Sequence, residues 1–562
     1  MNRSRIWLVA AAAGVLIAPV FVVPAQSSEV PIERDELAGL SGSLLELNKL
    51  ANDGAFSGGA GQVSNVTCTS TGNPATAVDL SCDGPTNPDN ELSIAVDPEN
   101  PDHLLAGSND YQILFKGGTI VARVPTGFFT SFDGGKTWTD GQIPMGSGGG
   151  GGNGDPVAVF NAKFDSASMV QLNAGCGQAG PYCGHISVAV SNSADGGLTW
   201  GNPITIAQGS GSLTPSANGI FMDKPWATVD NNPASPHFGR MYVTWTRYIL
   251  DKGAYIESPI YMAYSDNAGK TWTSGREISG SSSTLCTFQS AGAANECDED
   301  QFSAPAALPN GDLVVQFANG QNDATWESPF EFEDQIVTVR SSDGGRSFSN
   351  PIQVANLEDG VGTDYPINVD GRATQTGYQF RTQTVQGMTV DPVNGNLYVA
   401  WTDNRNGTID TGGVPVTHTD VFLAKSTDGG RSWSQTQQIT ATGADRWMPW
   451  VAARSGQVRI VYMEESGTGT YRIRMAKSSN GGSANSWSFS TLSTADSQAN
   501  TSIWFRAHAA DCDICATFIG DYNGVVIDSL GRTHAAWTDM SRLAEIPGFR
   551  AGAPQDAYYA RR

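Results

Sequence analysis

Basic residues are scarce in this 562-residue chain, which has 33 Lys and Arg against 56 Asp and Glu and a formal net charge of −23. An excess of negative charge on this scale argues against nucleic acid and against an anionic membrane surface as partners. Histidine is also rare, with six residues scattered along the chain. Together with the lack of a second Cys-x-x-Cys pair, this disfavours a zinc site.

Long apolar runs are absent after the first 25 residues, so nothing in the rest of the chain could cross a bilayer. At the N-terminus, Arg3 and Arg5 precede an apolar run over 6–23, and Val23 to Ala25 offer small residues for cleavage. We predict that residues 1–25 are a secretory signal peptide, so that the mature chain is secreted and has no membrane span. A membrane anchor is the alternative, because the run is near the lower limit for spanning.

Cysteine is limited to eight residues, which fall into four couples that are close in sequence. The couples are Cys68 with Cys82, Cys176 with Cys183, Cys286 with Cys297, and Cys512 with Cys515. In an exported protein such couples favour disulfides that staple loops. For Cys512 and Cys515 a redox pair or half of a zinc site is the alternative.

Glycine and proline are plentiful, with 65 and 28 residues, while charged residues make up only 16% of the chain. This composition is typical of a turn-dense, all-β protein rather than a helical one. The Gly-rich stretch 146–154 lacks the Lys-Ser/Thr ending of a phosphate-binding loop and is interpreted as a linker.

The clearest pattern is a recurring octet, Ser-x-Asp-x-Gly-x-Thr-Trp, which is intact from Ser131 to Trp138. The copies, some with Asn, Ser or Phe as substitutes, begin at Ser131, Ser193, Ser265, Ser341, Ser426 and, with two inserted residues, Ser478. Asp or Asn closes a turn through backbone N–H groups, Gly supplies a positive φ, and the aromatic ring packs on its own repeat. Such recurrence predicts a repeat architecture built on hairpins.

Alternating apolar segments precede each octet and predict three strands per repeat. This three-strand pattern starts seven times, near Leu92, Pro156, Pro225, Phe302, Val385, Trp447 and Phe518. The last copy ends without an octet, so the segment before residue 90 is predicted to supply its fourth strand and close a ring. Residues 26–90 are predicted to be an N-terminal extension with this strand and a short helix over 36–53.

The octet resembles the Asp-box, or bacterial neuraminidase repeat, of sialidase-like β-propellers, and the resemblance covers nearly all of the chain after about residue 90. It implies an all-β fold with a single β-propeller over residues 91–562. We expect about seven four-stranded blades with Asp-box hairpins on the rim. Six blades, as in catalytic sialidases, is the alternative.

In such a propeller the first strand of each blade lines the central channel, so polar residues at the starts of first strands are candidate site residues. Catalytic sialidases clamp a carboxylate with three arginines and use a Tyr nucleophile, a Glu that activates it, and an Asp acid/base. Their positions near first-strand starts make Tyr522, Asp521 and Asp223 the catalytic candidates. The substrate-binding candidates are Arg381, Arg446, Arg506 and Lys224, together with Trp447 and Trp450, which we interpret as exposed rings near the channel mouth that stack on sugars.

Other polar residues at first-strand starts are Glu91, Asp155, Asp300 and Gln301. The family's first arginine stands in a Phe/Tyr-Arg-Ile/Leu-Pro motif well before the first box. Here Ala122 to Pro125 lie only six residues before Ser131. This departure leaves sialic acid as the substrate, and hydrolysis itself, open.

Four acidic residues beside Cys297 are a candidate Ca²⁺ site. They are Glu296, Asp298, Glu299 and Asp300, and a solvated acidic loop is the alternative. No other cofactor is predicted.

The leading hypothesis is a secreted, sialidase-like, carbohydrate-active protein, a glycoside hydrolase whose partner is an extracellular glycan or glycoconjugate. The alternatives are a non-catalytic propeller that binds a glycan or protein at the cell surface, and a polysaccharide lyase with Tyr522 as its candidate residue.

Overall fold

The computed structural model describes residues 68–562, with gaps at 117–118, 146–151, 175–185, 211–218, 252–253, 289–292, 323–332, 361, 370, 383–386, 442, 506–515 and 547–549. Within these residues the chain is almost entirely β, and its one helical element is the 3₁₀ turn η3 (Ala499–Thr501). The predicted signal peptide and the predicted helix over 36–53 lie outside the described residues.

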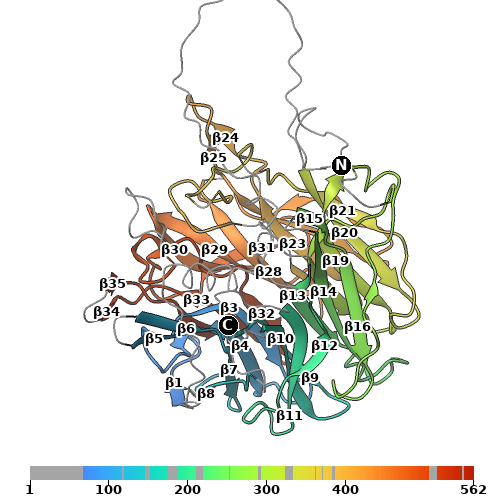
Figure 1. Cartoon of the computed structure of the whole chain (residues 1–562), viewed down its shortest axis with the longest axis horizontal. Helices are drawn as coiled ribbons and strands as arrows, with labels where there is room; N and C mark the ends of the chain where they lie inside the picture. The colour runs from blue at the N-terminus through green and yellow to red at the C-terminus, as the bar shows by residue number, and fades with distance from the viewer. Residues whose placement is uncertain are drawn as a thin grey trace, which may run out of the picture.

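Seven antiparallel sheets follow one another along the chain, each built from a first strand to a fourth strand (Figure 1). The first comprises β3 (Asp89–Val96), β4 (Leu104–Asp110), β7 (Thr126–Ser131) and β8 (Thr137–Gln142). The second comprises β9 (Gly152–Asn161), β10 (Ser166–Ala174), β11 (Ile186–Ser193) and β12 (Ile204–Ala207). The third comprises β13 (Gly219–Val229), β14 (Met241–Asp251), β16 (Ile260–Ser265) and β17 (Arg276–Glu277).

The fourth sheet comprises β18 (Asp300–Ala307), β19 (Leu313–Asn322), β20 (Glu333–Ser341) and β21 (Ile352–Asn356). The fifth comprises β22 (Gly387–Val390), β23 (Leu397–Asp403), β26 (Asp420–Ser426) and β27 (Gln437–Gln438). The sixth comprises β28 (Arg446–Arg454), β29 (Gln457–Gly467), β30 (Thr470–Ser478) and β31 (Trp487–Thr491). The seventh comprises β32 (Gly524–Ile527), β33 (Thr533–Asp539), β36 (Asp556–Arg561) and β2 (Val78–Asp79).

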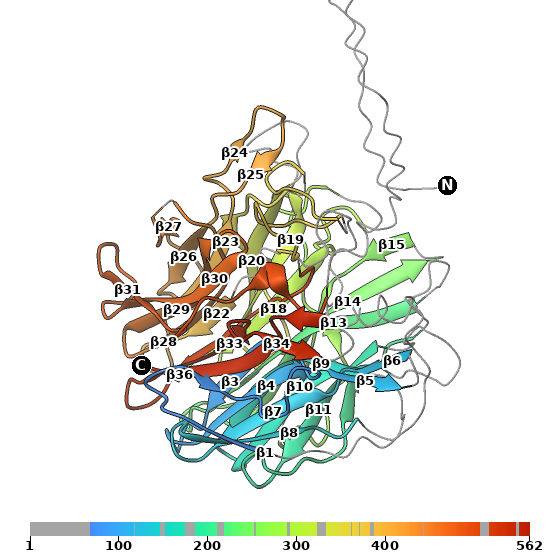
Figure 2. The same cartoon turned by 90° about the vertical axis from the view of Figure 1, so that its left-hand side faces the viewer.

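Short additional strands decorate this framework. They are β1 (Cys68–Thr71), which pairs with β8, β15 (Ala254–Glu257), which pairs with β14, and the hairpins β5 (Gln112–Lys116) with β6 (Thr119–Arg123), β24 (Thr408–Ile409) with β25 (Pro415–Val416), and β34 (Ala544–Ile546) with β35 (Arg550–Gly552). The β24–β25 hairpin projects from the body of the molecule in both views (Figure 2).

The sheets form a closed ring, because each first strand contacts the first strand of the next sheet and β32 contacts β3. The chain is therefore a β-propeller with seven blades, and the six-bladed alternative is wrong. The last blade takes its fourth strand from the N-terminal side, where Val78 pairs with Tyr559 and Asp79 with Tyr558. This confirms that the segment before residue 90 closes the ring and covers a sheet edge that would otherwise be open.

The hydrophobic core lies between adjacent blades rather than at one centre. Between blades 5 and 6, for example, Tyr398 and Leu423 pack against Val458 and Ile460. Second strands such as β4, β23 and β33 are buried along their whole length, because both faces of each blade are covered. Burial on both faces explains why these strands are apolar at successive positions rather than at alternate ones.

Each octet is the tight turn between the third and fourth strands of a blade. In the first octet, the Ser131 Oγ atom accepts a hydrogen bond from Gly135 N at 2.9 Å. Asp133 Oδ1 accepts from Lys136 N and from Thr137 N, both at 2.9 Å. Gly135 has φ +84°, which a residue with a side chain rarely adopts. These contacts confirm the predicted turn chemistry.

The octets also hold neighbouring blades together at the rim. Arg240 of blade 3 donates a hydrogen bond to the carbonyl of Gly344 in the fourth octet at 2.7 Å. Trp433 of the fifth octet donates to Thr338 Oγ1 of blade 4 at 3.1 Å. In the first octet, Gly135 lies against the ring of Tyr559 in blade 7. The octets thus fasten each blade to the one before it and help to close the ring.

Two of the four predicted disulfides are present in the described residues. Cys68 is bonded to Cys82, and Cys286 to Cys297. The couples Cys176–Cys183 and Cys512–Cys515 lie outside the described residues. No helix in the described part of the chain is long and apolar enough to span a membrane.

Candidate functional site

The first strands share a bulge near the start of each strand. In blades 1, 2, 3, 4 and 6 the pairing register with the second strand breaks at this point. One residue at each break has a positive φ: Glu91 (57°), Asp155 (50°), Lys224 (45°), Phe302 (54°) and Met448 (49°). A bulge of this kind changes the direction of a side chain, and backbone strain of this kind is concentrated at functional sites.

Three of the bulged residues, Asp155, Lys224 and Met448, are followed by proline. Proline has no N–H to donate to a β ladder, so within a sheet it fits a bulge or an edge. This Xaa-Pro signal at the start of a first strand is the sequence feature that could have located the bulges.

Five charged residues from different parts of the ring meet at these bulges, and we call them the central charge cluster. They are Glu91, Asp155, Lys224, Arg381 and Asp521. Lys224 Nζ lies 3.2 Å from Glu91 Oε1, 3.4 Å from Asp155 Oδ2 and 2.5 Å from Asp521 Oδ2. Arg381 donates two hydrogen bonds to Asp521, from Nε at 3.0 Å and from Nη2 at 2.5 Å.

All five side chains of the central charge cluster are buried. Burial works against the ionised form of Asp521, but the charges of Arg381 and Lys224 hold its pKa well below the usual range. Burial likewise opposes the charge of Lys224, and Asp155, Asp521 and Glu91 raise its pKa above the ordinary value. Burial raises the pKa of Glu91 well above its normal value, and Lys224 only partly opposes this. The pKa values of two carboxyl groups on one ammonium are therefore shifted in opposite directions.

Two of the predicted catalytic residues adjoin this cluster. Asp223 is buried next to Lys224 in β13. Burial opposes the charge of Arg381, but Asp521 first, then Glu91 and Asp223, raise the pKa of this guanidinium. Tyr522 follows Asp521, and Lys224 Nζ lies 5.5 Å from the centre of its ring. The Tyr522 hydroxyl donates to the carbonyl of Pro156 at 3.4 Å. Burial and then the carboxylates of Glu91 and Asp155 raise its pKa, so the phenol is neutral.

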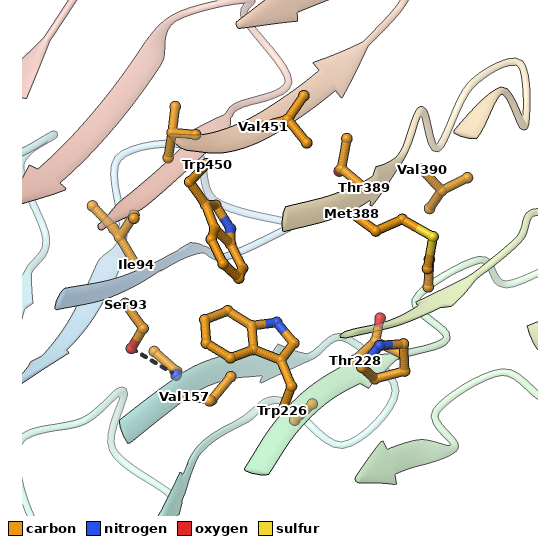
Figure 3. A pocket seen from close by; sticks show the side chains of 16 residues that line it. Ser93, Ile94, Val157, Trp226, Thr228, Met388, Thr389, Val390, Trp450 and Val451 are labelled. Carbon is orange, nitrogen blue, oxygen red and sulfur yellow. Dashed lines mark hydrogen bonds between the residues drawn. The ribbon is translucent and has the colours of Figure 1, made fainter. Parts of the chain in front are cut away.

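An aromatic layer lies along the channel next to the cluster. The Trp226 and Trp450 rings are 4.4 Å apart, and Tyr522 meets Trp226 edge-on at 5.2 Å. The cavity beyond this layer has a volume of about 180 Å³ and is lined by the first strands of all seven blades. Figure 3 shows the two indoles next to each other among the side chains that line it. No charged side chain is among its lining residues, which include Ser93, Thr228 and Thr389.

The predicted arginine clamp is not assembled in the described residues. Arg446 bonds to Asp420 at 2.8 Å and to Glu464 at 3.1 Å, and both partners lie on strands outside the channel wall. Arg446 therefore faces away from the cluster that holds Arg381. Arg506 lies outside the described residues.

The two predicted sugar-stacking tryptophans occupy different places. Trp447 is completely buried among Tyr378, Phe380 and Tyr471, so it has no surface to offer a ligand. Its assignment as an exposed platform was wrong. Trp450 is 9% exposed and lines the cavity. The β-bulge in β28 lies between these two residues and sends their side chains to different neighbours.

The acidic stretch at Glu296 to Asp300 does not gather its carboxylates around one point. Asp298 accepts a hydrogen bond from Gln321 Nε2 at 2.6 Å, and Asp300 accepts one from Asn319 Nδ2 at 2.7 Å. Across the described residues, the one group of three His, Cys, Asp or Glu side chains within ligand distance consists of Cys68, Cys82 and Asp140. The two sulfur atoms are bonded to each other there.

No protein-family model matches the sequence, and no curated protein matches it. Solved structures with a similar course of the backbone include an α-L-arabinanase from Penicillium chrysogenum with arabinobiose, with a TM-score of 0.40 and 14% identity over 77% of this chain and 98% of that one. An α-L-arabinofuranosidase from Fusarium graminearum has a TM-score of 0.41 and 12% identity over 75% and 98%. The Hadza microbial sialidase Hz136 has a TM-score of 0.40 and 12% identity over 88% and 94%.

Proposed function

We propose that this chain is a secreted, carbohydrate-active propeller, a glycoside hydrolase that acts at the central charge cluster. The observation that carries the proposal is the convergence of Glu91 and Asp521 on Lys224 with their pKa values shifted in opposite directions. Paired carboxyl groups whose surroundings separate their pKa values are the usual basis of acid and base roles in one site.

In this proposal Glu91 keeps its proton at neutral pH and protonates the leaving-group oxygen. Asp521 stays ionised and stabilises or attacks the positively charged sugar carbon. Because both carboxyl groups bond to one Nζ atom, their bonding oxygens lie within about 6 Å of each other, near the roughly 5–5.5 Å separation of retaining enzymes. In this proposal the enzyme therefore retains the anomeric configuration of the sugar. Asn109 Nδ2, which donates to Glu91 Oε2 at 2.8 Å, would orient the acid.

Neutral glycans fit this centre better than sialic acid. A carboxylate substrate needs guanidinium groups with free N–H donors, whereas Arg381 spends two of its donors on Asp521. The surrounding carboxyl groups of Asp155 and Asp223 would also repel a negatively charged sugar. The Tyr522 hydroxyl bonds to a carbonyl rather than to a carboxylate base, which favours a two-carboxylate scheme over a Tyr nucleophile.

Export is part of the same proposal. Disulfides such as Cys68–Cys82 persist in oxidising compartments, and the N-terminal apolar run has the features of a signal peptide. The octet turns, with their Ser, Asp and Gly contacts, support their interpretation as Asp-boxes.

The test is turnover of a panel of chromogenic α- and β-glycosides, including neutral pentosides, neutral hexosides and sialosides. Glu91→Gln and Asp521→Asn are each expected to lower kcat by about 10³-fold, the range of general acid–base catalysis. Asp300→Asn is the matched control, because Asp300 is also buried at the start of a first strand but bonds to Asn319 rather than to Lys224. If no glycoside is turned over by folded wild-type protein, the hydrolase is excluded.

A non-catalytic binding propeller is the second candidate. The observation that favours it is that Lys224 and Arg381 are already paired inside the protein and buried. Binding on a glycan array without turnover of any glycoside would support it. Absorbance from unsaturated uronates would instead indicate a polysaccharide lyase.

A further inference from the structure

Five buried or half-buried aspartates lie where the ring closes, and we call them the blade 1 acidic cluster. They are Asp79 on β2, Asp83 in the following loop, Asp89 on β3, Asp110 on β4 and Asp140 on β8. Asp89 and Asp110 are directly opposite each other in the β3–β4 pair. Asp83 acts electrostatically on Asp89, Asp110 and Asp140, so the group is compact.

The loop that carries Asp83 runs along the end of β4 and the start of β5. Tyr111 N donates to the carbonyl of Pro88 at 2.9 Å, and Ile113 N donates to the carbonyl of Thr86 at 3.1 Å. These backbone bonds place residues 86–88 beside residues 111–113. The loop joins the ring-closing strand β2 to the first strand of blade 1.

Some members of the cluster have all the hydrogen bonds they need. Asp89 accepts from Ser81 Oγ at 2.5 Å and from Ser108 Oγ at 2.6 Å, one on each oxygen. Asp140 accepts from Cys82 N at 3.1 Å. These carboxyl groups are held by the protein itself.

Three oxygen atoms of this cluster and of the adjacent Gln112 have no such partner. Asp83 Oδ1, Asp110 Oδ1 and Gln112 Oε1 are buried and accept no hydrogen bond from the described residues. Gln112 is fixed in this orientation, because its Nε2 donates to Gln142 Oε1 at 2.5 Å and Gln142 Nε2 donates to Asp110 Oδ2 at 2.6 Å. An unpaired buried acceptor costs roughly 1–3 kcal/mol, so three together need a ligand.

The missing partner must supply positive charge to oxygen atoms. Asp83 Oδ1, Asp110 Oδ1 and Gln112 Oε1 are all acceptors, and the carboxyl group of Asp89 lies on the residue opposite Asp110. Arg542, the basic residue that acts on Asp79, bonds to Asp556 at 2.9 Å. Ca²⁺ accepts carboxylate, amide and carbonyl oxygens in flexible geometry, whereas Mg²⁺ demands a strict octahedron.

We propose that a calcium ion binds at Asp83, Asp110 and Gln112 and ties the ring-closing loop to blade 1. Water and backbone carbonyls complete its coordination. The site is separate from the predicted Ca²⁺ stretch at Glu296 to Asp300 and from the central charge cluster. Bound there, the ion works alongside the Cys68–Cys82 disulfide at the point where the two ends of the propeller meet.

The experiment is thermal unfolding of the full mature chain after EDTA treatment, with CaCl₂ or MgCl₂ added back at pH 8. Ca²⁺ is expected to raise Tm by about 3 °C or more, because a ligand that binds only the folded state stabilises it by mass action. The shift should be lost in Asp110→Asn and in Asp83→Asn. It should persist in Asp298→Asn, a carboxyl variant in the other acidic stretch. Equal shifts with and without Asp110 overturn the proposal, as does no shift in the wild type.

A second measurement avoids variants that fail to fold. Calcium and protons compete for the same carboxyl oxygens, so titration calorimetry on the wild type should give one site whose affinity is at least tenfold higher at pH 8 than at pH 5.5. An affinity that does not change with pH places the ion elsewhere and overturns the proposal.

Discussion

The central charge cluster and the blade 1 acidic cluster both bury carboxyl groups, and they meet on the same two strands. On β4, Asn109 bonds to Glu91 of the first cluster, while Asp110 next to it belongs to the second. The side chains of successive residues in a strand point to opposite sides, which explains why Asn109 and Asp110 contribute to different clusters. The difference between the clusters lies in how negative charge is balanced. Lys224 and Arg381 neutralise the first, whereas the second is held by hydrogen bonds, protons and, as proposed, calcium.

This difference gives buried aspartates opposite protonation behaviour within a short distance. The pKa of Asp521 is lowered by the two cations, so it stays charged. The pKa of Asp79 is raised to about 7 by burial and by Asp556. Burial alone therefore does not determine whether a carboxyl group is ionised. Asp521 bonds to two cations and its pKa is lowered, whereas Glu91 shares only Lys224 and its pKa is raised.

The largest effect is expected from removing the shared cation of the central charge cluster. Lys224→Met leaves Glu91, Asp155 and Asp521 without their common partner, and breaking a buried ion pair from one side costs about 3–5 kcal/mol. Urea unfolding at pH 8 measures the loss. Lys477→Met, on an exposed lysine of β30, is the control and should change stability by less than about 0.5 kcal/mol. A loss for Lys224→Met no larger than the control would mean that the cluster does not hold the blades together.

The octet turns could be predicted from the sequence, whereas the candidate site could be predicted only in part. Ser131, Asp133 and Gly135 interact within one turn, so local chemistry defines the structure. The candidates Lys224, Arg381 and Asp521 were recognised from their positions near first-strand starts. The sequence did not show that three carboxylates share Lys224, because these contacts depend on how the seven blades are arranged about the central axis.

Arg381 and Arg446 illustrate the limit. Both precede or begin a first strand, yet Arg381 bonds to Asp521 and Arg446 bonds to Asp420 of the neighbouring blade. The bulges decide which side chains face the channel, and a bulge shifts the pleat by one residue without changing the alternation that a reader of the sequence sees. For this reason the assignment of Trp447 was wrong, whereas Trp450, on the other side of the same bulge, lines the cavity.

A smaller effect, with opposite signs in the two clusters, is expected from exchanging one carboxyl group for an amide at pH 8 in EDTA. Asp521→Asn should destabilise by about 3 kcal/mol, because Lys224 and Arg381 lose a charged partner. Asp140→Asn should stabilise by about 1–2 kcal/mol, because an amide still accepts from Cys82 N and needs no proton. Urea unfolding of both variants checks the signs, and the same sign in both would break the comparison.

The pH dependence of the wild type has a definite sign for the same reason. With a folded pKa of about 8 for Asp140 and an unfolded value of roughly 3.9, the folded state binds more protons between these limits. The contribution of Asp140 to stability in EDTA therefore falls as pH rises from about 4 to 8, and the slope of stability against pH should differ in Asp140→Asn by this contribution. Asp521 has a lowered pKa, so its contribution is present above roughly pH 4 and is lost only at more acidic pH.

The smallest effect on stability is expected at Asp343, an exposed carboxylate that is held by backbone N–H groups rather than by a cation or a proton. In the fourth octet, Asp343 Oδ1 accepts from Arg346 N and Ser347 N, both at 2.9 Å. The third octet already carries Asn267 at this position, and its Oδ1 accepts from Thr271 N at the same distance. Asp343→Asn should therefore cost less than about 1 kcal/mol in urea unfolding at pH 7. Asp343→Ala, which removes the acceptor, should cost more, and equal costs would mean that the charge rather than the acceptor holds the turn.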